Sequence, residues 1–382
     1  MHRTLGRQRQ VFERGGRIQI GNYLSSGLSP NTMRSGINVL VLGAALALGG
    51  PQSAGLSSFY EGKNVSYIVA TNAGGGYDAY ARLIGPYMEK HLRADHVIIR
   101  NVPGAGHLVG ANTLARSKPD GLTIGTFNAG LIYGQLAGNR SLRFDLRDLS
   151  WIGKAAGEVR AVIVSARCHV TTLDDLLAAS EPVNFASAGI GSASYVDTLL
   201  LAEALNLNIR IIPGYAGSAA EMAMLRGEIC GLVASASSVE NFVGAGNASY
   251  VLTVGGRIEG VPSAFDYATD ERARQIVRLV SMMAELGRVS AAPAGTPAAR
   301  LADLREAYRS SLEDPALRAD AARARRPIDP AFGEEVRDLV VAALDQSPET
   351  IEIIKRAVAS DAGRASLSGR NGHEVELASA TF

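Results

Sequence analysis

The sequence has no excess of charge of either sign. Its 382 residues include 38 Lys and Arg against 37 Asp and Glu, a formal net charge of +1 at pH 7. A protein that tracks a nucleic-acid backbone or adheres electrostatically to a membrane usually carries a clear excess of positive charge. We therefore expect no nucleic-acid partner and no electrostatic membrane anchor.

The motifs of common catalytic sites are also missing. There is no GxSxG, HExxH, GxxxxGK or paired CxxC, and the 6 His are scattered. We interpret His107 and His169 as surface or supporting residues rather than catalytic bases. These absences disfavour the common classes of hydrolytic enzyme.

Only one long apolar run is present, INVLVLGAALAL at 37–48. A helix of this length spans about 18 Å, well short of the roughly 30 Å hydrocarbon core, which favours a signal peptide over a membrane span. We expect residues 1–55 to be a leader, with Met33 as the true start, cleavage after Ala54 or Gly55, and export to the periplasm.

Cysteine is scarce, with Cys168 and Cys230 as the only two in the chain. An exported protein can form disulfides, but only where the two Cα atoms come within about 7 Å. The sequence leaves a disulfide and two buried thiols equally open.

Apolar, β-branched segments alternate with helical patterns over most of the chain. This order is typical of parallel βαβ units and predicts an α/β fold. We expect strands at 65–71, 96–102, 122–127, 159–166, 183–188, 209–215, 229–236 and 251–256. Residues 297–360 are expected to be mostly helical, without strands, and to pack on an earlier sheet.

Two glycine-rich turns, GGGYD at 74–78 and SAGIGSAS at 187–194, each follow a strand and open a helix. The N-terminus of a helix has unpaired N–H groups and a positive dipole end, which together attract anions. Ser192 and Ser194 add hydroxyl donors, and Asp78 is placed to cap its helix. The two turns therefore predict a shared anion site.

A third turn, GAGHLVG at 104–110, imitates a dinucleotide-binding turn and raises the alternative of an NADP-dependent enzyme. Pro103 leads directly into the turn, however, and the nearest suitable acid, Asp120, lies in a PDG turn between a helix and a strand. Nicotinamide cofactors are also scarce in an exported setting.

Several segments resemble the substrate-binding receptors of tripartite tricarboxylate transporters, also called Bug proteins. They are GGGYDAYAR (74–82), NVPGAGHLVGANTLARSKPDGLTIG (101–125), SAGIGSAS (187–194), PGYAGSAAEM (213–222) and GRVSAAPAGTP (287–297). The resemblance implies a type II periplasmic binding protein, with two α/β lobes and a ligand cleft between them. It assigns residues 56–165 plus 283–382 to lobe 1 and 166–282 to lobe 2.

The resemblance also implies a function and a site. It implies a protein that is not an enzyme and has no catalytic residues, no metal and no cofactor. The receptor would bind a small carboxylate, a di- or tricarboxylate or a related acid, as a monomer, and deliver it to integral-membrane permease subunits; a module that serves a membrane sensor is an alternative. The implied ligand-binding residues are Ala73, Gly74, Gly75, Gly76, Tyr77, Asp78, Ser187, Ala188, Gly189, Gly191, Ser192, Ser194, Tyr195, Tyr215 and Gly217.

This chain departs from the family pattern at four positions. Tyr195 stands where many relatives have His, Ala73 and Ala220 stand where Pro is common, and Ala216 replaces a frequent Lys. These departures leave the anion site intact but change the shape of the expected cleft. We expect Gly75→Val or Gly191→Val to abolish ligand binding in a folded protein.

Overall fold

The computed structural model describes residues 58–356, so the expected leader, its apolar run and its cleavage position lie outside the described residues. The strands are β1 (Asn64–Val69), β2 (His96–Asn101), β3 (Thr123–Thr126), β4 (Ser150–Lys154), β5 (Arg160–Ser165), β6 (Val183–Ser187), β7 (Ile209–Pro213), β8 (Gly231–Ser235), β9 (Ala248–Val254), β10 (Val289–Ala292) and β11 (Ala331–Phe332). Within residues 58–356, no helix combines the length and hydrophobicity needed to cross a membrane.

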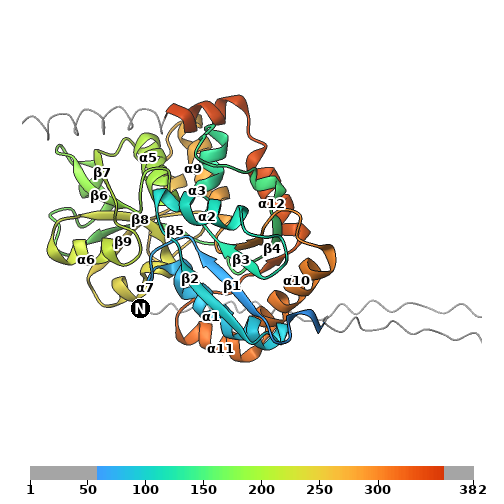
Figure 1. Ribbon diagram of the computed structural model, residues 1–382. Coiled ribbons are helices and arrows are strands. Elements are labelled where there is room, and N and C mark those ends of the chain that lie inside the picture. Colours follow the sequence, from blue (N-terminus) through green and yellow to red (C-terminus); the bar gives the residue numbers. More distant parts are fainter. Residues whose placement is uncertain (1–57, 357–382) are drawn as a thin grey trace, which may run out of the picture. The chain divides into compact units, whose positions relative to one another are not determined.

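The α-helices connect and cover these strands (Figure 1). They are α1 (Gly76–Leu92), α2 (Leu108–Ala115), α3 (Gly130–Leu136), α4 (Leu173–Leu177), α5 (Ala193–Leu205), α6 (Ala219–Arg226), α7 (Ala236–Gly244), α8 (Ala264–Tyr267), α9 (Glu271–Glu285), α10 (Ala298–Glu313), α11 (Pro315–Arg323) and α12 (Glu334–Leu344).

The first sheet has the order β11-β4-β10-β3-β1-β2. β1 pairs in parallel with β2 and β3, while β10 is antiparallel to β3 and β4. Helix α1 packs on this sheet because Tyr80, Ile84 and Met88 recur every fourth residue and form one buried face. The apolar run of β1 is buried, as expected for a central parallel strand.

The second sheet has the order β7-β6-β8-β5-β9. β6 is parallel to β7 and β8, whereas β5 is antiparallel to both of its neighbours. All six residues of β5 are buried, which accounts for its nearly unbroken apolar sequence RAVIVS.

The chain passes between the sheets twice. It leaves the first sheet after β4, and returns through α9 to β10 after β9. The expected α/β class with two sheet-centred halves is therefore confirmed. The division at residues 165/166 and 282/283 stays a prediction; the strand pairing puts β5, assigned to lobe 1 by that division, in the second sheet.

All eight expected strands are present, within a few residues of their predicted ends. The sequence analysis missed β4 and β10, which are short and antiparallel and lack a helical crossover of the βαβ kind. The helical segment after residue 297 packs on the first sheet through α10 and α12, as expected. It does contain the two-residue strand β11, so the expectation of no strand there is wrong.

Cys168 and Cys230 form a disulfide, with 5.3 Å between their Cα atoms. The bond joins the segment after β5 to the residue before β8, and settles the question that the sequence left open. His169 lies beside the two sulfur atoms. Because both sulfurs are held in the disulfide, this cluster does not offer thiolate ligands to a metal.

Candidate functional site

The two glycine-rich turns end strands of different sheets. The first connects β1 to α1, where Gly75 is the N-cap residue and Gly74 has a φ of +86°. The second connects β6 to α5, where the Ser192 side chain accepts a hydrogen bond from the Tyr195 N–H. Each turn therefore presents the N-terminus of a long helix, as the sequence predicted.

A cavity of about 160 Å³ lies between these turns. Eight of the residues expected at the site line it: Gly74, Gly75, Gly76, Tyr77, Ala188, Ser194, Tyr215 and Gly217. Seven do not line it: Ala73, Asp78, Ser187, Gly189, Gly191, Ser192 and Tyr195. The structure thus brings the three expected segments together, and separates residues that face the cavity from residues that support it.

Asp78 is a supporting residue. Its buried carboxylate accepts hydrogen bonds from the Gly74 N–H at 3.0 Å, the Arg82 guanidinium at 2.9 Å and the Asn101 amide at 3.0 Å. Burial disfavours the charged form, but these hydrogen bonds outweigh it and keep the pKa of Asp78 below its usual value. Asp78 therefore stabilises the first turn, and its carboxylate already accepts from one N–H group of that turn, that of Gly74.

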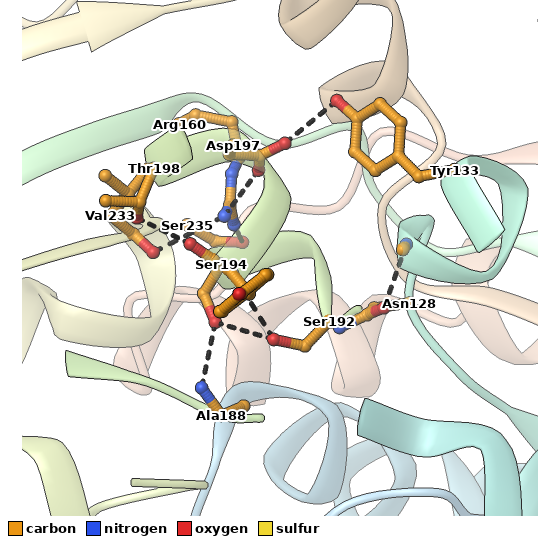
Figure 2. A network of polar contacts seen from close by, with 12 residues as sticks. Asn128, Tyr133, Arg160, Ala188, Ser192, Ser194, Asp197, Thr198, Val233 and Ser235 are labelled. Carbon is orange, nitrogen blue, oxygen red and sulfur yellow. Dashed lines mark hydrogen bonds and ion pairs between the residues drawn. The ribbon is translucent and has the colours of Figure 1, made fainter. Parts of the chain in front are cut away.

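The hydroxyls of the second turn are engaged within the turn (Figure 2). The Ala188 N–H donates to Ser194 Oγ at 3.1 Å, and Ser192 Oγ donates to the Gly189 carbonyl at 2.7 Å. The side chain of Ser192 is fully buried. The expectation that Ser192 offers a free hydroxyl is therefore wrong, and the Ala188 amide is satisfied by a neighbouring side chain.

The third turn, expected only in the nucleotide-binding alternative, lines the same cavity through Pro103, Gly104, Gly106 and His107. Its backbone has positive φ at four successive residues, 127° at Gly104, 45° at Ala105, 60° at Gly106 and 81° at His107. Asp120 lies in a turn, where it accepts a hydrogen bond from the Leu122 N–H at 2.9 Å. The sequence had indicated this turn, although not its place beside the other two.

His107 is 6% exposed, so of the two expected roles, surface or supporting residue, the structure excludes the first. Its Nε2 lies 2.7 Å from Asn128 Nδ2, and the Asn128 carbonyl oxygen accepts from the Gly130 N–H. This arrangement makes Nε2 the acceptor of a neutral imidazole. Burial lowers the pKa of His107 to about 4, with a smaller opposing effect from the Ala70 backbone.

The lowered pKa of His107 predicts a pH-dependent stability. Below pH 6.5 the unfolded chain takes up a proton that the folded protein takes up only near pH 4. The free energy of unfolding should therefore fall by up to about 3 kcal/mol between these values. His107→Asn, whose side chain tolerates the left-handed backbone, should lack this component in urea titrations from pH 7 to 4. Identical pH profiles for the two proteins would contradict the assignment.

Two buried arginines also line the cavity, and neither was predicted. Arg160 donates to Asp197 at 2.7 Å, and more weakly to Ser235 Oγ at 3.3 Å and the Val233 carbonyl at 3.4 Å (Figure 2). Tyr133 donates to the same carboxylate at 2.9 Å. Burial raises the pKa of Asp197, while Arg160 and Tyr133 oppose that rise.

Arg288 forms the second buried ion pair, with 2.6 Å between its Nε and Glu158 Oε1. Its guanidinium lies over the rings of Tyr77 and Tyr80, at 4.4 and 4.9 Å from their centroids, and Nη2 donates to Ser238 Oγ at 2.7 Å. Burial raises the pKa of Tyr77 to about 12, with Arg288 opposing the rise, so the phenol is neutral at physiological pH. In the sequence, the sign of such a pair was that Arg288 and Glu158 each stand in an otherwise apolar segment.

The turns approach one another so closely that an added side chain would press on the facing backbone. A Cβ added to Gly75 would lie 3.1 Å from Gly217 Cα, and one added to Gly106 would lie 2.5 Å from the Ile190 carbonyl oxygen. Each contact joins a turn that follows a strand of the first sheet to a segment that follows a strand of the second. Glycine is needed here for backbone contact as well as for turn conformation.

The fold and this inter-sheet cavity are those of a type II periplasmic binding protein. Among solved structures, the chain is similar to BugD, with a TM-score of 0.67, 22% identity, and coverage of 78% of this chain and 98% of that one. It is also similar to MatC from Rhodopseudomonas palustris, with a TM-score of 0.61, 21% identity, and coverage of 78% and 99%. These likenesses concern the fold.

The sequence comparisons identify the family. The model of the tripartite tricarboxylate transporter family receptor matches residues 80–357. The chain is 28% identical over 263 residues to a UPF0065 protein of Agrobacterium vitis, covering 67% of this chain and 73% of that protein. It is 24% identical over 214 residues to BugT of Bordetella pertussis, covering 54% and 65%. The chain belongs to this receptor family, whose members are solute-binding receptors rather than enzymes.

Proposed function

We propose that the protein is an exported receptor that binds a small carboxylate in the inter-sheet cavity and delivers it to a tripartite tricarboxylate-type permease. The observation that carries the proposal is the meeting of two helix N-termini and two arginines at one cavity. MatC was solved with malate, and another R. palustris protein of the same fold with adipate.

The proposed site comprises the expected residues, with Gly75, Gly76, Tyr77 and Ser194 facing the ligand and Asp78 and Ser192 supporting the turns. Hydrogen bonds to a charged group contribute about 1.5–3 kcal/mol each. Three or four of them suffice for micromolar affinity once ordering costs are subtracted.

The remaining parts of the proposal concern the setting of this receptor. The apolar run at 37–48 directs export, and the mature chain acts as a monomer in the periplasm. Its lobes, 56–165 plus 283–382 and 166–282, close around the ligand by a hinge motion, and the closed form docks on the permease.

A thermal-shift screen tests this function directly. The panel is dicarboxylates, tricarboxylates, amino acids, aromatic acids and NADPH. A ligand at about 100 times its dissociation constant adds about 2.7 kcal/mol, which raises the melting temperature by several degrees. We expect a shift with at least one carboxylate and none with NADPH. If NADPH alone raises the melting temperature, the receptor proposal is wrong and the nucleotide-binding alternative takes its place.

The location of the site is tested by Gly75→Val. The backbone φ of Gly75 is −84°, which any residue adopts, so the substitution acts mainly through the contact with Gly217. We expect a folded protein whose ligand-induced shift is abolished. At Gly191 an added Cβ meets no atom within 4 Å, but the φ of +80° strains any side chain there, so a loss of binding in Gly191→Val would act through the turn conformation. Gly134→Ala is the matched control, because Gly134 lies outside the cavity lining and an added Cβ there comes no closer than 3.8 Å to its neighbours. It should keep the shift; equal shifts in both variants would move the site elsewhere.

A further inference from the structure

The positive charge at the cavity is already balanced by the protein. Arg160 is paired with Asp197 and Arg288 with Glu158, and all four side chains are buried. The two guanidinium groups therefore add no net charge to the space that a ligand enters. Each additional charge brought by the ligand needs its own partner, because an unpaired charge is costly to bury.

Glu221 contributes a third charged side chain to the cavity lining. It lies in the first turn of α6 and is partly buried. Among residues 58–356, no hydrogen bond or ion pair holds the Glu221 carboxylate. Burial raises the pKa of Glu221, and the positive charge of Arg326, which makes no direct contact with it, opposes this rise. Arg326 donates instead to the Ser237 carbonyl. Glu221 thus leaves an acceptor for a cationic group of the ligand.

Arg160 provides the complementary donor. Its Nε is buried and has no hydrogen-bond partner among the described residues, although the residue lines the cavity. Its other nitrogens are occupied by Asp197, Ser235 and Val233. A buried guanidinium N–H without an acceptor is unfavourable unless a ligand supplies one.

The cavity has room for a small organic molecule. Its volume of about 160 Å³ is close to that of an engineered cavity of about 150 Å³ that holds benzene. A dicarboxylate in this space would put a second carboxylate beside Glu221.

We propose that the ligand is a small amino carboxylate with no net charge, whose carboxylate accepts from Arg160 Nε and whose ammonium group pairs with Glu221. The inference rests on the proposed receptor function and narrows its ligand class. It also explains why a carboxylate site contains an additional acidic side chain: Glu221 selects for the ammonium group and against a second carboxylate.

Calorimetric titration of the protein expressed from its full coding sequence tests the ligand class. L-Alanine, β-alanine and 4-aminobutyrate place an ammonium group one, two or three carbons from the carboxylate; butyrate and succinate are the matched mono- and dicarboxylate. We expect one of the amino carboxylates to bind at least 10-fold more tightly than butyrate and succinate. Tighter binding of succinate, or equal binding of butyrate, overturns the inference and leaves the receptor function standing. If none of the five compounds binds, the inference is overturned. If, in addition, no carboxylate in the thermal-shift screen raises the melting temperature, the proposed receptor function is overturned too.

Glu221→Gln tests the residue itself. It keeps the size of the side chain and removes the charge, so the affinity for the preferred amino carboxylate should fall by about 10- to 100-fold while succinate binds better. Glu228→Gln is the control, since Glu228 is exposed, pairs with Arg226 and lies outside the cavity lining. An unchanged affinity in Glu221→Gln overturns the inference whichever ligand the wild type prefers.

Discussion

Replacement of Asp197 by alanine is expected to lower the free energy of unfolding by about 3–5 kcal/mol. The substitution leaves the Arg160 guanidinium buried without its carboxylate, and also removes the acceptor of the Tyr133 hydroxyl. A buried charge that loses its partner costs far more than the pair itself contributes. Guanidinium chloride unfolding, followed by circular dichroism, measures the loss.

Two comparisons separate this effect from a simple loss of a contact. Glu228→Ala removes an exposed partner of Arg226 and should leave the unfolding free energy close to that of the wild type. The double variant Asp197→Asn/Arg160→Gln removes both charges and should recover much of the stability lost by Asp197→Ala. A double variant as unstable as the single one would show that packing, not the stranded charge, causes the loss.

The sequence predicted the parts of the fold that depend on local pattern. Parallel strands such as β1 and β6 are short apolar runs followed by glycine and a helix, so their positions and the two glycine-rich turns could be found from spacing alone. β4 and β10 were missed because antiparallel strands at the sheet crossing lack that signature. Their pairing is decided by long-range contacts, which the sequence order does not show.

The charged lining of the cavity was harder to predict for a different reason. Arg160 begins a fully buried strand and Asp197 lies in an apolar helix, and neither has a neighbour in sequence that reveals the other. Their contact depends on the packing of α5 against the β5–β8 pair. Single polar residues in apolar segments indicate a buried partner somewhere, but not which one.

The glycines of the turns meet two structural requirements, only one of which follows from the local sequence. A turn at a helix N-terminus accounts for the positive φ at Gly74 and Gly106. The backbone contacts of Gly75 with Gly217, and of Gly106 with Ile190, are a second requirement that only the folded chain displays. The same residues therefore shape the proposed anion site and permit the two halves to meet around it.

Loss of the disulfide is expected to cost about 4 kcal/mol of unfolding free energy, by the chain-entropy account of cross-links. The two cysteines are 62 residues apart in the sequence, so reduction frees a long loop in the unfolded chain. Denaturant titration of Cys168→Ser/Cys230→Ser measures the loss. Adding a reductant should destabilise the wild type to a similar degree and leave the double variant unchanged, and a difference below about 1 kcal/mol would contradict the expectation.

The same variant separates stability from binding. β5 and β8 are antiparallel, with Arg160 opposite Ser235 at one end of the pair and Val164 opposite Gly231 at the other. The disulfide lies beyond the Val164 end, whereas the cavity lies at the Arg160 end. Ligand affinity of the folded double variant should therefore equal that of the wild type, measured well below its melting temperature. A parallel loss of affinity would mean that the cross-link at one end of this strand pair fixes the position of the guanidinium at the other.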